Sequence, residues 1–144
     1  MPTFLILDLT ETHVQFLLRW SEKRLVPGTG TLLRSKIGTT NIVSVVASVG
    51  KPPRELVGAS VTVYYHDAIL SSVTVVHPDW RCQGVGRQML RMKRDELLDR
   101  GVRLESIVGV TNKASMRMTE SVLRPVGIIG EGPRGPRMKF IADD

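Results

Sequence analysis

A strand that runs into a glycine turn and then into a helix is the feature that most constrains the fold of this chain. The apolar run Ala68–Val76 ends at His77-Pro78, and the turn Arg81-Cys82-Gln83-Gly84-Val85-Gly86-Arg87 follows. Residues 84–100 are amphipathic at helical spacing and predict a helix. The first amides of a helix have no partners within it, and glycines let a ligand approach the backbone closely. The sequence therefore predicts an anion site at this turn.

Basic side chains surround the predicted start of this helix. Arg87 and Arg91 fall in its opening turns, where the helix dipole favours Asp or Glu, and Arg81 lies just before them. A bound polyanion would relieve this conflict. The alternative is a glycine turn that only joins a strand to a helix. The three arginines favour the anion site.

A dinucleotide site is a second alternative for the same turn. Glu105 lies about 20 residues beyond the glycines, where a ribose ligand is expected. The third glycine of that fingerprint is missing, because Met89 occupies its position. The antiparallel strands that we expect before the turn also differ from a dinucleotide fold, so we do not adopt this interpretation.

The composition is that of a globular protein of ordinary size. The chain has 144 residues, of which 42% are hydrophobic and 24% charged, which is enough to build a core and predicts one domain over residues 1–144. No apolar stretch approaches the roughly 20 residues that span a bilayer. The apolar run at residues 4–7 lacks the flanks of a signal peptide. A single cysteine, Cys82, excludes an internal disulfide, and we expect a cytoplasmic protein with no membrane partner.

The net charge of +6 raises the question of a nucleic-acid partner. The 20 basic residues are spread along the chain, with local density at residues 81–94 and 117–139. Two Trp, two Tyr and three Phe leave little for base stacking. We therefore expect no nucleic-acid partner, and a polyanionic small molecule fits the charge at least as well.

Hydrophobic periodicity and breakers give a coarse order of elements. We expect strands at residues 4–9, 41–49, 56–65, Ala68–Val76, 106–111, 127–130 and 137–141. We expect helices from a Thr10 or Thr12 cap to about Arg24, at residues 84–100, and at residues 113–123 where Pro125 would stop the helix. Residues 32–40 are either a loop or a short helix. The strands at 41–76 should form an antiparallel meander, and the strand at 106–111, reached by a helical crossover, should lie parallel to Ala68–Val76.

The turn and its approach resemble the acyl-CoA motif of the GCN5-related N-acetyltransferases, in which Arg or Gln is followed by two residues and then Gly-x-Gly or Gly-x-Ala. Here Val75-Val76-His77-Pro78-Asp79-Trp80 precedes Arg81-Cys82-Gln83-Gly84-Val85-Gly86. The resemblance is best over residues 69–112 and weaker out to 128. It implies an α/β (α+β) fold, a mixed and mostly antiparallel sheet with a central splayed parallel strand pair and flanking helices. The expected element order fits this fold, with the usual second helix reduced or missing.

The resemblance also implies the residues of a cofactor site. In the family, pantetheine pairs with the strand before the turn, the pyrophosphate sits on amides of the turn, and an Asn after the next strand binds the pantetheine arm. The residues assigned to the site on this basis are Thr74, Val75, Val76, Arg81, Cys82, Gln83, Gly84, Val85, Gly86, Arg87 and Asn112. Asn112 is equally suited to capping the helix that follows it. We assign no metal ligand.

The resemblance does not extend to the family's acid and base. The Glu that many members carry five residues before the Asn is Ile107 here, and the Tyr seven residues after it is Thr119. A shifted alignment finds only Leu123 in the Tyr position. Thr119 could serve as the acid that protonates the thiolate, and Glu105 could replace the base. His77, Tyr64, Tyr65 and Ser72 are further candidates for the base, each with an ordinary structural role as the alternative.

Cys82 is not assigned as a nucleophile. No His-Asp pattern accompanies it, and direct transfer needs no acyl-enzyme.

The resemblance implies an acetyl-CoA-dependent N-acetyltransferase that acts directly on a primary amine of a small molecule or a protein. Basic residues in the segments that would face the acceptor, Arg34, Lys36, Arg134 and Arg137, favour an acidic or protein-borne acceptor. Two alternatives stay open. One is a catalytically degenerate member that binds CoA or a protein partner without turnover, and the other is a small basic nucleic-acid or regulatory protein. The fold is also compatible with a homodimer.

Overall fold

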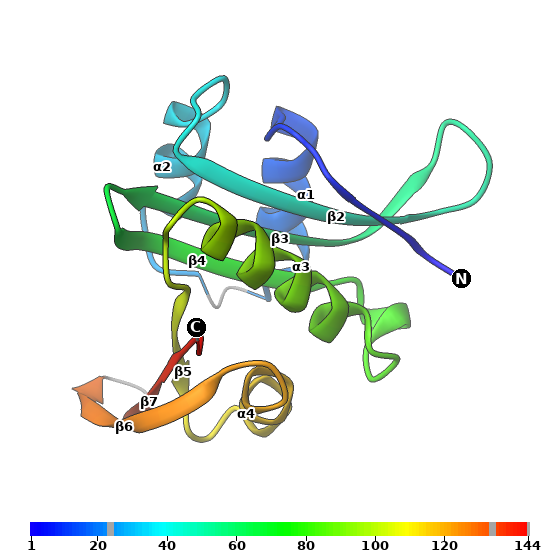
Figure 1. Ribbon diagram of the computed structural model, residues 1–144. Helices are drawn as coiled ribbons and strands as arrows, with labels where there is room; N and C mark the ends of the chain where they lie inside the picture. Colours follow the sequence, from blue (N-terminus) through cyan, green and yellow to red (C-terminus); the bar gives the residue numbers. More distant parts are fainter. Residues whose placement is uncertain (23–24, 133–134, 144) are drawn as a thin grey trace.

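The computed structural model describes residues 1–22, 25–132 and 135–143 (Figure 1). The strands are β1 (Thr3–Ile6), β2 (Ile42–Val49), β3 (Glu55–Tyr65), β4 (Ala68–Val76), β5 (Glu105–Gly109), β6 (Arg124–Gly132) and β7 (Gly135–Ile141). The helices are α1 (Glu11–Trp20), α2 (Thr29–Ser35), α3 (Val85–Asp99) and α4 (Lys113–Glu120), with a short 3-10 helix at Pro78–Trp80. The mixed α/β fold class expected from the sequence is confirmed.

The strands form two antiparallel sheets. The first has the order β1-β2-β3-β4 and contains the predicted meander, in which Ser60 of β3 pairs with Thr74 of β4. The second has the order β5-β7-β6, so β7 lies between two strands that precede it in the chain.

Strands β4 and β5, the predicted central pair, contact each other, but no ladder joins them among the described residues. One mixed sheet was expected; two sheets that meet at this pair are found. Figure 1 shows α4 and the second sheet below the first. The edge of β4 that faces away from β3 is therefore left without a strand partner in the part of the chain that the structure describes.

Helices cover both faces of the first sheet. Successive side chains of β3 point to opposite faces, and both faces are buried along most of the strand. Ala59, Val61 and Val63 pack in the apolar cluster that includes residues of α1 and α2. The opposite face carries Gly58, where an added Cβ would lie 2.7 Å from the Met89 methyl of α3. In Figure 1, α3 lies across the front of this sheet and α1 and α2 lie behind it.

The first helix and strand differ in length from the expectation. Strand β1 ends at Ile6, not at residue 9. Helix α1 begins after Thr10, whose side chain accepts a hydrogen bond from the His13 amide. The Thr10 amide in turn donates to Nδ1 of the His13 side chain. The helix ends at Trp20, and its expected end at Arg24 lies outside the described residues.

Two later boundaries also differ from the expectation. Helix α2 begins at Thr29, three residues before the ambiguous region 32–40, and covers only the first four residues of that region. The second helix is therefore short but present. Helix α4 ends at Glu120 because the amides of Val122 and Leu123 turn back to the Thr119 carbonyl. Pro125 lies inside β6, at an irregular register with β7, where it does not interrupt a helix.

Among the described residues, no helix has both the length and the apolar character needed to cross a bilayer.

Candidate functional site

The glycine turn leaves β4 by a tightly defined backbone path. Pro78–Trp80 form one turn of 3-10 helix, and the first α-helical residue of α3 is Val85. Gly84 is its N-cap, with φ +81°, and Cys82 also has positive φ at +61°. The left-handed region favours glycine, so Gly84 supplies a conformation that a larger residue would strain. The helix therefore starts one residue later than the sequence indicated.

This turn presents unpaired amides. Within the described part of the chain, no hydrogen bond is donated by the backbone amides of residues 82–87. Helix α3 runs for 15 residues behind them, so its dipole adds partial positive charge at the same point. A Cβ on Gly84 would meet no atom within 4 Å. The turn is thus an open cradle of donors suited to phosphate oxygens.

The three arginines assigned to the turn have different environments. Arg81 bends back, donating Nε to the Val76 carbonyl at 3.2 Å and pairing with Glu22 beyond α1. Its guanidinium also reaches the Trp20 carbonyl at 3.4 Å. Arg81 therefore links the turn to the end of α1 instead of projecting freely into solvent.

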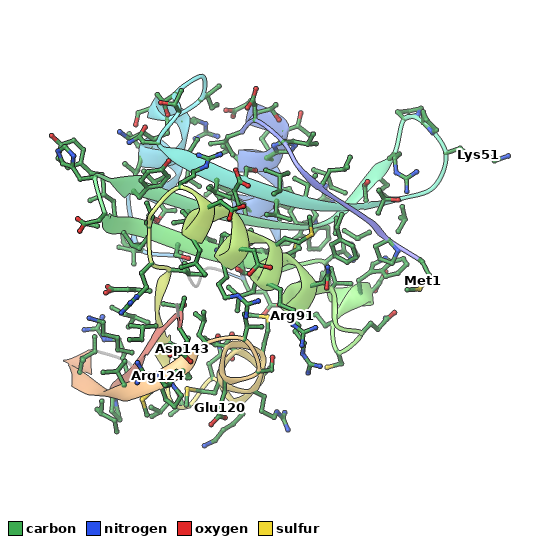
Figure 2. The ribbon with its side chains drawn as sticks, in the orientation of Figure 1. Met1, Lys51, Arg91, Glu120, Arg124 and Asp143 are labelled. Carbon is green, nitrogen blue, oxygen red and sulfur yellow. The ribbon has the colours of Figure 1, made fainter. Side chains whose placement is uncertain are left out.

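Arg87 and Arg91 are exposed on α3. Neither forms an ion pair with another described residue, whereas Arg94 pairs with Asp95 and Arg100 with Glu96. Figure 2 shows Arg91 on the side of α3 that looks toward α4. The uncompensated positive charge near the cradle comes from these two side chains.

Strand β4 brings Thr74, Val75 and Val76 to the edge that no strand covers. The Thr74 hydroxyl shares a 2.7 Å hydrogen bond with the Ser60 hydroxyl, and Val75 is buried against the α1 side. Val76 packs on the opposite side, with α3. An extended ligand can add to such an edge through backbone hydrogen bonds.

Asn112 caps α4, as one of its two predicted roles required. Its Oδ1 accepts a hydrogen bond from the Ser115 amide at 3.3 Å. Its side-chain NH₂ donates to no other described residue. The cap thus uses one end of the amide and leaves the other end for a ligand.

The two residues suggested for the acid and the base are not placed together at the cradle. Thr119 is shielded from solvent, and Glu105 lies far from the glycine turn. Thr119 is only 2% exposed, inside α4. Glu105 begins β5, 3.7 Å from Lys139, and lines a cavity of about 380 Å³ with Asp67 and Gly101. That cavity lies at the C-terminal end of α3, roughly 20 Å from its start. The structure does not bring Glu105 and the glycine turn together.

The remaining base candidates have structural contacts. His77 packs on Trp20, with ring centroids 4.3 Å apart, and accepts from the Asp79 amide. Tyr64 bonds to Arg100, while Tyr65 is exposed. The expected Glu position holds Ile107, so no carboxylate is present there, and the Ile107 side chain is 52% exposed. Ser72 alone among them contacts a buried titratable group.

That group is Lys93, which the sequence reasoning missed. Its side chain is fully buried between α3 and β4, and Nζ donates to the Ser72 hydroxyl at 3.0 Å. Burial lowers the pKa of Lys93 to about 7, since the charged form loses its hydration. The available signal was its spacing: Lys93 lies four residues from both Met89 and Leu97, in the apolar stripe of the helix.

Comparison with known proteins identifies the family of this chain. The family model described as the acetyltransferase (GNAT) family matches residues 42–123, which include β2 to α4 and the glycine turn. A search of curated protein sequences returned no match.

Similar solved structures cover nearly the whole chain. A spermidine N-acetyltransferase SpeG mutant from Vibrio cholerae has a TM-score of 0.71 at 14% identity, covering 97% of this chain and 94% of its own. The ribosomal-protein-S18-alanine N-acetyltransferase from Escherichia coli has a TM-score of 0.68 at 22% identity, covering 96% and 91%. A putative acetyltransferase of the GNAT family from Desulfovibrio desulfuricans has a TM-score of 0.72 at 12% identity, covering 99% of both chains. At these identities the likeness establishes the fold.

Proposed function

The chain belongs to the acetyltransferase (GNAT) family, and from that premise we propose that it is an acetyl-CoA-dependent N-acetyltransferase acting directly on a primary amine. The observation that carries the proposal is the cradle of unpaired amides at residues 82–87, open to solvent around Gly84. A pyrophosphate needs several donors at one point, and an ordinary helix start leaves only a few. We further propose that residues 1–144 act as one cytoplasmic domain.

The residues around the cradle have distinct roles in this proposal. The amides of residues 82–87 hold the pyrophosphate, with Arg87 and Arg91 adding positive charge. The free edge of β4 at Thr74 to Val76 pairs with the pantetheine arm, and the side-chain NH₂ of Asn112 donates to it. A backbone amide of β4 then polarises the thioester carbonyl, which favours the transition state for attack by the amine.

The acceptor is proposed only as a primary amine. The two named neighbours act on spermidine and on a ribosomal-protein alanine, so the neighbours include both a small molecule and a protein. Of the four basic residues that favoured an acidic acceptor, Arg34 pairs with Glu11 at 2.9 Å and Arg134 lies outside the described residues. Of the four, Lys36 and Arg137 are left to support an acidic acceptor. A homodimer remains part of the proposal.

A second candidate function rests on Ile107 and Thr119. The β5 position expected to hold a carboxylate is apolar, and the position expected to hold a Tyr is a buried Thr. A protein of this kind could bind CoA, or a protein partner, without turnover. Thiol release from acetyl-CoA over a panel of primary amines separates the two functions.

The test of the first proposal is a thermal shift with acetyl-CoA. Wild type should gain several degrees at about 100 times the dissociation constant. Gly84→Glu should lose this gain, because the carboxylate enters the cradle and repels phosphate. Gly101→Glu is the matched control, since Gly101 has φ +77°, equally open space and a place at the other end of α3. No shift in wild type, or an equal shift in Gly84→Glu, would overturn the site.

A further inference from the structure

Lys93 occupies a position in α3 where an apolar residue is expected. Val85, Met89, Lys93 and Leu97 recur every four residues and are all buried. This stripe packs on the face of the first sheet that carries Gly58. A lysine ammonium in such a layer loses its hydration without a compensating carboxylate, which destabilises the fold. Core packing alone gives no reason for an amine here.

The sheet opposite Lys93 supplies hydroxyl groups. Ser72 Oγ accepts from Lys93 Nζ at 3.0 Å and from Thr62 Oγ1 at 3.1 Å. The next pair along the same face, Ser60 and Thr74, shares a 2.7 Å hydrogen bond. Ser72 and Thr74 are only partly buried. The hydroxyls therefore connect a fully buried amine to the strand whose other edge is open.

In the part of the chain that the structure describes, no counter-charge faces Lys93 from the elements that α3 contacts most, β1 to β4 and α4. Strands β1, β2 and β4 contain no titratable side chain. On β3, Tyr64 bonds to Arg100, and Glu55 and Tyr65 are exposed. On α4, the titratable residues are exposed: Lys113, Arg117 and Glu120. Within α3 itself, Arg94 pairs with Asp95 and Glu96 with Arg100, and the other titratable residues, Arg87, Arg91 and Asp99, are exposed.

Because no anion offsets desolvation, the pKa of Lys93 falls to about 7. A substantial fraction of the amine is then neutral at neutral pH. The neutral nitrogen has a lone pair, so its 3.0 Å contact with Ser72 Oγ can also form with the serine hydroxyl as the donor. A group with this pKa is well matched to proton transfer at physiological pH.

We propose that Lys93, acting through the hydroxyl of Ser72, accepts the proton that an acceptor ammonium must lose before it attacks the thioester. This inference rests on the proposed function and supplies the proton acceptor that Ile107 cannot. It places Ser72 nearest to the reacting groups, on the same strand as the Thr74 to Val76 edge. Lys93 is a positioning residue, because it works through Ser72.

The proton and bond changes balance without another reagent. The acceptor ammonium, directly or through water, gives a proton to Ser72 Oγ, which passes its own proton to neutral Lys93 Nζ. The free amine forms the C–N bond and the C–S bond breaks. The second proton on the nitrogen goes to the leaving thiolate, giving the CoA thiol. Lys93 returns its proton to solvent.

The experiment measures kcat against pH from 5.5 to 9.5 with saturating acetyl-CoA. The acceptor probes are spermidine and a peptide with an N-terminal alanine. The variants are Lys93→Met, Ser72→Ala and the hydroxyl-retaining Ser72→Thr. Lys51→Met is the matched control, because Lys51 is exposed on the β2–β3 loop, away from α3 (Figure 2).

Wild type should show a rising limb in kcat with a midpoint near pH 7. Lys93→Met and Ser72→Ala should lose this limb and roughly 10- to 100-fold of kcat at pH 7.5, less than a directly placed base supplies. Their KM for acetyl-CoA should stay within about twofold of the wild-type value. Ser72→Thr keeps a hydroxyl, so it should recover the rising limb and part of the kcat that Ser72→Ala loses. Lys51→Met should behave as wild type.

Several outcomes would overturn the inference. Lys93→Met with an unchanged kcat profile would leave Lys93 a purely structural residue. Full activity in Ser72→Ala would exclude the route through Ser72, and it stays informative even if Lys93→Met does not fold. If wild type binds acetyl-CoA but acetylates neither probe, the proposed function fails, and the inference about Lys93 fails with it. If wild type acetylates a probe and the variants keep its pH profile, only the inference about Lys93 and Ser72 fails.

Discussion

Arg81 of the glycine turn forms an ion pair with Glu22, 59 positions earlier in the chain. The same guanidinium donates to the carbonyls of Val76 and Trp20. Both charged side chains are partly exposed, so the pair itself contributes about 1 kcal/mol or less. The bonds to two carbonyls add to this and tie the cradle to the helix on the far side of the sheet.

Arg81 and Arg87 should therefore respond differently to truncation. Arg81→Ala should lower the free energy of unfolding by about 1 kcal/mol, or roughly 2–4 °C in Tm. Arg87→Ala should leave Tm unchanged and weaken acetyl-CoA binding, with a shallower dependence of affinity on salt. Thermal melts and calorimetric titrations at two salt concentrations check both. Equal effects of the two variants on stability would contradict this division.

The two roles of Asn112 can be separated by a residue that caps but cannot donate an amide. Asn112→Ser should keep the cap of α4 and hence nearly the wild-type Tm, whereas Asn112→Ala should lose about 1 kcal/mol. Both should weaken acetyl-CoA binding to the same degree, because both lack the NH₂ group. If Asn112→Ser binds acetyl-CoA as wild type does, the side chain is only a helix cap.

Gly86, in the first turn of α3, packs closely against Met118 of α4, which leaves no room for a larger side chain. A Cβ at Gly86 would lie 2.5 Å from the Met118 sulfur and 3.4 Å from a methyl group of Val76. Gly86→Ala should therefore cost about 1–2 kcal/mol, although the family motif accepts Ala at this position. In the double variant with Met118→Ala, the cost of Gly86→Ala should shrink by about 1 kcal/mol. Chemical unfolding of the four proteins in this cycle measures the coupling.

Stability should depend on pH through Lys93. Its folded pKa, about 7, is below the ordinary 10.5. Between these values the unfolded chain binds the proton and the folded chain does not, so the free energy of unfolding from this group rises with pH. Lys93→Met should thus be more stable than wild type by a few kcal/mol at pH 7, and the difference should shrink toward pH 10.

Urea unfolding at several pH values measures this difference, with Lys51→Met as the control for a solvated lysine. A difference between Lys93→Met and wild type that stays constant from pH 7 to pH 10 would mean that Lys93 remains protonated when folded.

Much of the fold was predictable because its signals are local. Strand β4 was predicted to the residue, since its apolar run is bounded by the His66-Asp67 turn and by Pro78. The start of α3 was predicted within one residue from the glycines. The end of α4 was not, because a turn of the backbone at Thr119, and not Pro125, stops it. The roles assigned to the site residues stay predictions.

The sequence by itself determined the glycine turn, the meander before it and the family to which the turn belongs, since each depends on backbone preferences and spacing within a few tens of residues. Only the tertiary structure decided that Arg81 turns toward Glu22, that Glu105 lies at the other end of α3, and that Lys93 meets Ser72. Arg81 and Glu22 are 59 positions apart in the chain, and Lys93 and Ser72 are 21 positions apart. Their energies depend on what surrounds each side chain after packing, which no local pattern specifies.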